Sequence, residues 1–89
     1  MLRPEYTGQF KNDLKRIQKR NLPIEHLKEI IKKLCNEEKL PEKNKDHELT
    51  GNWKGCRECH IKPDWLLIYE VGNEIIVFER TGSHSDLFR

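Results

Sequence analysis

Residues 65–81 read WLLIYEVGNEIIVFERT, and this stretch decides the fold. Two runs rich in β-branched and aromatic residues, Trp65 to Val71 and Glu74 to Thr81, flank the dipeptide Gly72-Asn73. A Gly-Asn pair between two such runs is typical of a two-residue β-hairpin loop. The stretch therefore predicts two adjacent antiparallel strands.

The predicted hairpin also sets the register of the strands. Counting outward from the loop gives the opposed pairs Val71–Glu74, Trp65–Arg80 and Asp64–Thr81. A third strand is expected from Cys56 to Ile61, and a hairpin turn through Ile61 to Asp64 would pair His60 with Trp65. Because directly opposed residues project to the same face, His60, Trp65 and Arg80 should form one row across the sheet.

A short strand, Leu2 to Glu5, and two amphipathic helices are expected before this sheet. Thr7 can cap the first helix, whose end is predicted at Asn21. Pro23 suits the first turn of the second helix, which is expected to end at Lys39-Leu40-Pro41. Their apolar faces consist of Phe10, Leu14 and Ile17 in the first helix and of Ile24, Leu27, Ile30, Ile31, Leu34 and Cys35 in the second. The predicted class is α+β, with one domain over residues 1–89.

Length and composition agree with a small globular domain. The chain has 89 residues, of which 35% are hydrophobic and 36% are charged. No run approaches the roughly 20 apolar residues of a membrane span, and the first residues lack the apolar core of a signal peptide. A cytoplasmic protein that does not contact membranes is expected, with its three cysteines as reduced thiols rather than disulfides.

Positive charge is concentrated in the first half of the chain. Residues 1–45 contain 12 Lys and Arg against 7 Asp and Glu, whereas residues 46–89 contain 5 against 8. This distribution suits contact with a polyanion such as RNA. Two ordinary solvated helix faces would give the same pattern. The residues proposed for RNA contact are Lys11, Lys15 and Lys19.

The segment Cys56-Arg57-Glu58-Cys59-His60 matches the C-x-x-C-H spacing of covalent haem attachment, and its cysteine pair is also compatible with zinc or redox chemistry. The context opposes all three. The only methionine is Met1, no second pair of zinc ligands follows at short spacing, and the segment falls in a predicted strand. No metal or cofactor is expected.

The second half of the chain contains a candidate acid/base site. His47, His60 and His84 accompany Asp64 and Arg80. Imidazole transfers protons near neutral pH, and an arginine stabilises developing negative charge, so this set suits phosphodiester chemistry. Structural roles are the alternative: His47 could end a connector, and Asp64 could serve only as a turn residue.

Three segments carry a family resemblance: residues 46–55 (DHELTGNWKG), 60–69 (HIKPDWLLIY) and 78–84 (FERTGSH). They resemble the YafQ branch of the RelE/ParE toxin superfamily. The resemblance implies a RelE-like fold and a cytoplasmic toxin that enters the A site of the 70S ribosome and cuts mRNA. It also implies a cognate antitoxin, and contact with operator DNA only through that antitoxin.

Carried over position by position, the resemblance implies catalytic roles for His47, His60, Asp64, Arg80 and His84. It also implies supporting roles in substrate binding for the aromatic residues Trp65 and Phe88. The implied reaction is metal-free attack of a 2′-hydroxyl on the adjacent phosphate. His84 is expected to donate a proton and Arg80 to hold the phosphate, while Asp64, His60 and His47 share base and positioning work.

Two cysteines depart from the family pattern, since Cys56 replaces a frequent aromatic residue and Cys59 a frequent small one. Neither change removes a catalytic group. Two other functions remain open at this level: a ParE-like gyrase inhibitor, whose relatives lack this histidine set, and a non-catalytic module that binds RNA or protein.

Overall fold

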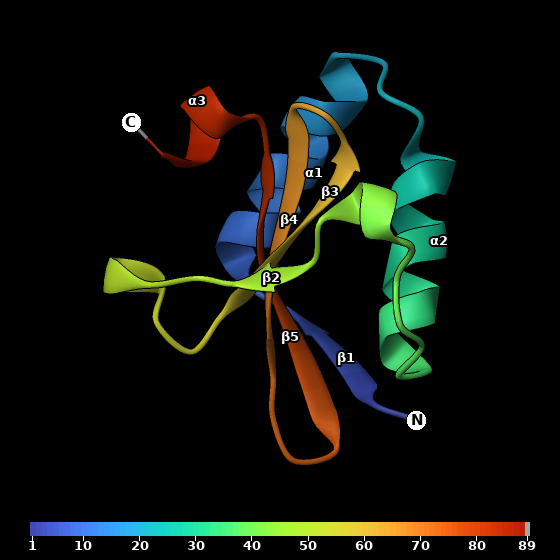
Figure 1. The fold of residues 1–89 in the computed structure, drawn as a ribbon. Coiled ribbons are helices and arrows are strands. Elements are labelled where there is room, and N and C mark those ends of the chain that lie inside the picture. The colour runs from blue at the N-terminus through green and yellow to red at the C-terminus, as the bar shows by residue number, and fades with distance from the viewer. Residues whose placement is uncertain (89) are drawn as a thin grey trace.

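The computed structural model describes residues 1–88, which form a five-stranded mixed sheet with three α-helices (Figure 1). In chain order the elements are β1 (Arg3–Tyr6), α1 (Gly8–Lys19), α2 (Ile24–Cys35), the 3₁₀ turn η1 (Glu42–Asn44), β2 (His47–Glu48), the 3₁₀ turn η2 (Gly51–Trp53), β3 (Arg57–Lys62), β4 (Trp65–Val71), β5 (Ile75–Gly82) and α3 (His84–Leu87). The sheet order is β1-β5-β4-β3-β2, with β1 parallel to β5 and the other pairs antiparallel. The predicted α+β class is confirmed, whereas β2 and α3 were not predicted.

The two long helices begin close to the predicted positions. Thr7 caps α1 through its hydroxyl oxygen, and α1 ends before Asn21, which has a left-handed φ of 57°. The predicted end of α2 is wrong. The helix stops at Cys35, because Glu37 adopts a left-handed φ of 60° and turns the chain before Lys39-Leu40-Pro41. A glutamate in this conformation gives no local sequence signal.

Both faces of the sheet are covered, which explains why the first five residues of β4 are all buried. The face toward α1 and α2 forms the main core with Cys59, Trp65, Leu67, Tyr69, Ile76 and Phe78. The opposite face holds a smaller cluster of Cys56, Leu66, Ile68 and Leu87, packed against Leu49 and Trp53. Full burial of a large apolar side chain contributes roughly 1.5–3 kcal/mol, so these two layers supply most of the driving force.

The β4–β5 turn is longer than the predicted two residues. Val71 opposes Ile76 rather than Glu74, and the N–H of Gly72 donates to the carbonyl of Ile75 over 2.9 Å. The left-handed residue of this loop is Glu74, with a φ of 65°. The Gly72-Asn73 signal therefore indicated the wrong turn. The residue that adopts positive φ is Glu74, and glutamate rarely does so.

A β-bulge then shifts the register a second time. Tyr69 opposes Phe78 but Ile68 opposes Arg80, so Glu79 has no partner of its own on β4. A bulge adds one residue to one strand and changes which side chains share a face beyond it. Arg80 consequently falls in register with Ile68.

These shifts overturn the predicted row of His60, Trp65 and Arg80. The observed pairs are Lys62–Trp65, His60–Leu66, Leu67–Thr81 and Ile68–Arg80. His60 and Arg80 still share a backbone face, two residues apart along the strands. Trp65 instead lies in the main core with 2% of its surface exposed, and Thr81 does not oppose Asp64.

Cys56 and Cys59 lie in different layers of the structure. Cys56, which precedes β3, belongs to the small cluster, and Cys59, on β3, belongs to the main core. Both are buried free thiols, as is Cys35, and burial raises the pKa of the Cys59 thiol. Among residues 1–88, no helix is long and apolar enough to cross a membrane.

Candidate active site

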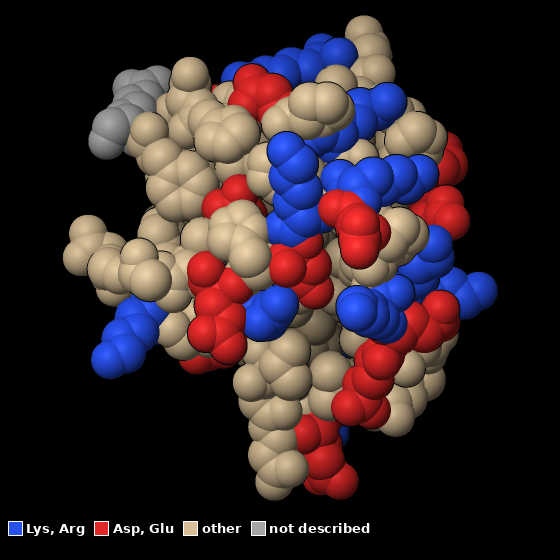
Figure 2. Space-filling view, viewed as in Figure 1, with Lys and Arg blue, Asp and Glu red and all other residues tan. Residues whose placement is uncertain are grey.

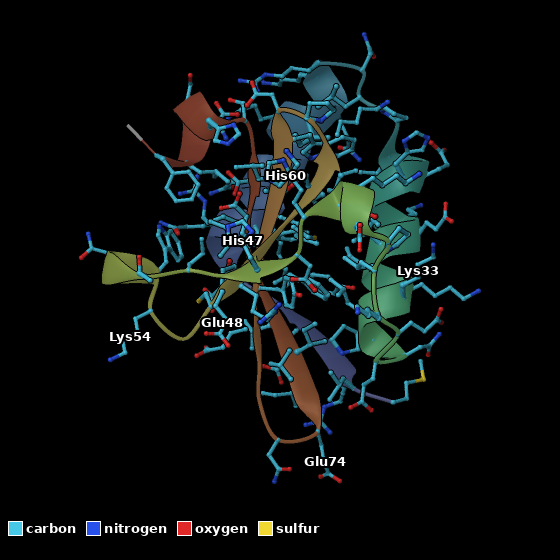
Figure 3. The ribbon with its side chains drawn as sticks, viewed as in Figure 1. Lys33, His47, Glu48, Lys54, His60 and Glu74 are labelled. Atoms are coloured by element: carbon cyan, nitrogen blue, oxygen red, sulfur yellow. The ribbon has the colours of Figure 1, made fainter. Side chains whose placement is uncertain are left out.

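Four titratable side chains form a continuous row at one end of the sheet. Glu58 and His60 come from β3, Asp64 from the β3–β4 turn and His84 from the first position of α3. Glu58 Oε1 lies 3.3 Å from His60 Nε2, the two imidazole rings meet edge to face with centroids 5.8 Å apart, and His84 Nδ1 lies 2.6 Å from Asp64 Oδ1. Figure 3 shows His60 at the upper end of the sheet, far from Glu74 at the β4–β5 turn.

The Asp64 carboxylate determines which nitrogen of His84 exchanges a proton. Asp64 Oδ1 accepts the backbone N–H of His84 over 2.9 Å in addition to the ring contact. These two hydrogen bonds lower the pKa of Asp64, so its carboxyl group is ionised at neutral pH and can only accept. His84 Nδ1 therefore carries hydrogen, and Nε2 is the nitrogen left to give or take a proton.

The second imidazole is oriented in a similar way by β3 and the following turn. His60 Nδ1 lies 3.3 Å from the carbonyl oxygen of Pro63, which can only accept a hydrogen bond. Nε2 then faces Glu58, which has 5% of its surface exposed. Glu58 was not predicted as a site residue, although its two-residue spacing from His60 on a predicted strand places both on one face.

The position of His84 is set by a clamp around α3. The Asp86 carboxylate accepts the backbone N–H of Ser83 over 2.9 Å, while the Ser83 hydroxyl accepts the N–H of Asp86 over 3.2 Å. Arg20, beyond the end of α1, donates two hydrogen bonds to the same carboxylate at 2.7 and 3.1 Å. The guanidinium of Arg20 holds the pKa of Asp86 well below its usual range. Neither Arg20 nor Asp86 was predicted as a site residue, because α3 itself was not predicted.

Arg80 is held by a buried carboxylate of α1. Its Nε and Nη2 donate to Asp13 at 2.8 and 3.1 Å, and the N–H of Thr81 donates to Asp13 over 3.1 Å. The Thr81 hydroxyl also accepts from Trp65 Nε1 over 2.9 Å. From its position in the core, Trp65 thus supports β5, the strand that carries Arg80. An acidic residue on the apolar side of α1, between Phe10 and Ile17, was the signal that sequence analysis missed.

The remaining predicted residues lie outside this row. His47 is exposed on β2, where it opposes Glu58, and its Nδ1 lies 2.6 Å from the carbonyl oxygen of Lys45 (Figure 3). Phe88 follows α3 with 39% of its surface exposed. The three lysines proposed for RNA contact, Lys11, Lys15 and Lys19, are exposed on α1, whose buried face is formed by Phe10, Asp13 and Ile17.

Among residues 1–88, two groups of side chains bring potential metal ligands within 4.8 Å of one another. One consists of Glu58, His60 and His84, which belong to the candidate active site. The other consists of Cys56, Glu70 and Glu79 on the opposite side from the helices. Imidazole nitrogens with one carboxylate oxygen suit zinc or copper, so the first group could bind such an ion in place of protons.

The fold and the row of acid/base groups define a small toxin with a RelE-like fold. Residues 2–89 match the YafQ family, described as bacterial toxins of type II toxin–antitoxin systems, and the chain belongs to this family. It is 46% identical over 85 residues to the mRNA interferase toxin YafQ of Escherichia coli, which covers 94% of this chain and 92% of that protein. The predicted family is thereby confirmed.

Solved structures agree over the full length. A crystal structure of the E. coli DinJ–YafQ complex contains a chain that matches with a TM-score of 0.93 and 43% identity, covering 100% of both chains. A metal-bound toxin from Helicobacter pylori matches with a TM-score of 0.93 and 40% identity, covering 99% of this chain and 100% of that one.

Proposed function

We propose that this chain is an mRNA interferase, an endoribonuclease that cleaves mRNA in the A site of the 70S ribosome. The observation that carries the proposal is the row Glu58–His60–His84–Asp64, which contains one imidazole suited to donate a proton and one suited to accept it. The names of the E. coli relatives support the same activity.

The proposed reaction transfers two protons. The 2′-hydroxyl oxygen bonds to the adjacent phosphorus while its proton moves to the base, and the bond from phosphorus to the 5′-oxygen breaks while the acid protonates that oxygen. The first product ends in a 2′,3′-cyclic phosphate. His84 Nε2 serves as the acid when its ring is protonated, because Asp64 holds Nδ1–H and stabilises the imidazolium.

His60, together with Glu58, serves as the base. Both ring nitrogens of His60 lie 3.3 Å from an acceptor oxygen, Nδ1 from the Pro63 carbonyl and Nε2 from the Glu58 carboxylate. A neutral ring carries only one N–H, so its other nitrogen is free to take a proton. The proton from the 2′-hydroxyl moves to that nitrogen, and Glu58 stabilises the imidazolium that forms.

Arg80 stabilises the negative charge of the five-coordinate phosphorus (the phosphorane) that forms during the reaction. His47 assists in positioning the RNA strand. Asp13 holds Arg80 through two of its three guanidinium nitrogens and so limits its rotation. A preoriented cation stabilises transition-state charge better than a mobile one, because no reorganisation is needed during the reaction. Phe88 is exposed beside α3 and is available to stack on a base.

The family also indicates the partners of the chain. A cognate antitoxin would silence it, as the DinJ–YafQ complexes indicate for the E. coli protein, and operator DNA would be contacted only through that antitoxin. Lys11, Lys15 and Lys19 project from the exposed face of α1 and are proposed to contact ribosomal RNA. Such contacts weaken as salt concentration rises.

The test is His84→Gln in a bacterial translation extract, with mRNA ends mapped by primer extension. Loss of a general acid should slow in-frame cleavage by roughly 10²–10⁴-fold. Glu74→Gln, at the far end of the sheet, is the control and should cleave normally (Figure 3). Undiminished cleavage by the His84 variant would overturn the mechanism. Intact mRNA together with double-strand DNA breaks would indicate gyrase inhibition, and intact mRNA without such breaks a non-catalytic binding module.

A further inference from the structure

A basic groove adjoins His60 beside η1. Its cavity of about 470 Å³ is lined by His26, Lys43, Asn44, Lys45, His60, Ile61, Lys62 and Pro63. Three lysines and two histidines are thus present, and no acidic side chain is among the lining residues. Figure 2 shows Lys and Arg side chains over the upper part of this face, with acidic side chains among them.

The positive charge of this groove is not neutralised. Arg16, Arg20, Arg57 and Arg80 each pair with a carboxylate. Within residues 1–88, by contrast, none of the groove lysines, Lys43, Lys45 and Lys62, forms an ion pair. Three ammonium groups around one cavity repel each other, and a polyanion relieves that repulsion.

The turn formed by η1 and Lys45 carries two of the groove lysines, Lys43 and Lys45. Hydrogen bonds join this turn to β2 and to β3, the strands that carry His47 and His60. Asn44 is buried, and its side-chain amide donates to the carbonyl of His60 on β3 over 2.7 Å. His47 Nδ1 on β2 donates to the carbonyl of Lys45 over 2.6 Å. The distance from the lysines to the site is therefore built into the fold.

Lys45 also carries backbone strain at this point. Its φ of 47° and ψ of 44° lie in the left-handed region, which glycine and asparagine occupy far more readily. Strain retained by a surface lysine is an observation from which a functional constraint can be inferred. Lys45 presents its charge to the groove from this conformation.

We propose that this groove binds the phosphates of the RNA strand that flank the bond cut at the active site. The inference rests on the proposed function, because the bound strand is the one cleaved by His60 and His84. Single-stranded RNA fits the groove chemically, because lysine is a point charge for phosphate and His60 itself lines the cavity. Lys43, Lys45 and Lys62 are then the substrate contacts nearest the reacting phosphate.

The test measures binding alone. The ligand is a fluorescent 2′-O-methyl oligonucleotide of about ten residues, which cannot be cleaved because its 2′-oxygens are blocked. Affinity is measured against salt concentration for the wild type, for the groove variant Lys43→Gln/Lys45→Gln/Lys62→Gln and for a control variant. The control, Lys28→Gln/Lys32→Gln/Lys39→Gln, removes the same charge from exposed lysines that do not line this cavity.

Three phosphate contacts on a single strand contribute a salt slope of about 2. The groove variant should show a slope lower by about that amount and bind roughly 100-fold more weakly near 0.1 M salt, with the control close to wild type. Single substitutions should each lower the slope by about 0.7, which keeps the test valid if the triple variant fails to fold. Equal losses in both triple variants, or no binding by the wild type at low salt, would overturn the proposal.

The test also separates this inference from the proposed function. The oligonucleotide assay requires no cleavage, so binding by the groove can be confirmed or refuted even if the wild type cleaves no mRNA. An unchanged RNA slope with reduced binding of an acidic peptide would assign the groove to a protein partner and overturn the RNA proposal.

Discussion

Asp13→Ala should destabilise the protein strongly. Asp13 has 1% of its surface exposed and accepts hydrogen bonds from Arg80, from the backbone of Thr81 and from Arg16. Truncation leaves a largely buried guanidinium without its counter-charge, because only 18% of the Arg80 side chain is exposed. It also leaves the buried N–H of Thr81 unpaired. Breaking a buried ion pair from one side costs about 3–5 kcal/mol, a large share of the 5–15 kcal/mol typical of a domain.

Urea unfolding at neutral pH measures this loss. With a slope of about 1–3 kcal/mol per molar for a small domain, the midpoint should fall by roughly 2 M. Glu29→Ala is the control, since Glu29 pairs with Lys33 on the exposed side of α2 at 3.7 Å. Loss of an exposed pair at this helical spacing costs about 0.3–0.5 kcal/mol.

A double-mutant cycle tests the cause of the loss. Asp13→Ala/Arg80→Ala removes the stranded charge together with its partner, so the combined loss should be smaller than the sum of the two single losses by about 0.5–3 kcal/mol. Strict additivity, or a loss below about 1 kcal/mol for Asp13→Ala, would refute the reasoning that this carboxylate anchors Arg80.

Two further predictions concern the clamp that positions His84. Gly82→Ala should destabilise the fold by about 1–3 kcal/mol in urea unfolding, because the added Cβ would lie 2.9 Å from Asp86 Oδ2; an unchanged midpoint would show that α3 shifts freely. The second is a pH dependence. The folded pKa of Asp86 lies below its unfolded value of about 3.9, so the unfolded state binds more protons at acidic pH. The stability that Asp86 contributes should be complete above about pH 4 and lost as the pH falls toward its folded pKa. Asp86→Asn should abolish this part of the acid sensitivity, and equal acid sensitivity of the two proteins would contradict it.

The elements that were predicted are those with a strong local pattern. β4 was predicted with its observed bounds, and Thr7 caps α1 as expected, because burial and capping leave periodic or positional signals in a short window. β2 and α3 are two and four residues long, too short for any periodicity to appear. The end of α2 was misplaced because Glu37 turns the chain without a glycine.

The chemical inventory of the site was likewise readable, and His60, Asp64 and His84 do lie together. The arrangement of the site residues across the strands could not be predicted. The register depended on a left-handed Glu74 and on a bulge at Glu79, and each moves every more distant pair of the two strands by one or two residues. The row through Trp65 was wrong for that reason.

By itself, then, the sequence determined the α+β class, the main strands and helices and the family, and it predicted three members of the row, His60, Asp64 and His84, because these depend on residue type and local spacing. The tertiary structure alone decided which groups share a proton or a charge. Glu58 faces His60, Asp13 holds Arg80, and the Lys45 turn is fastened beside the site. These are contacts between residues whose distance in the chain carries no information about their distance in space, and only the packed fold sets them.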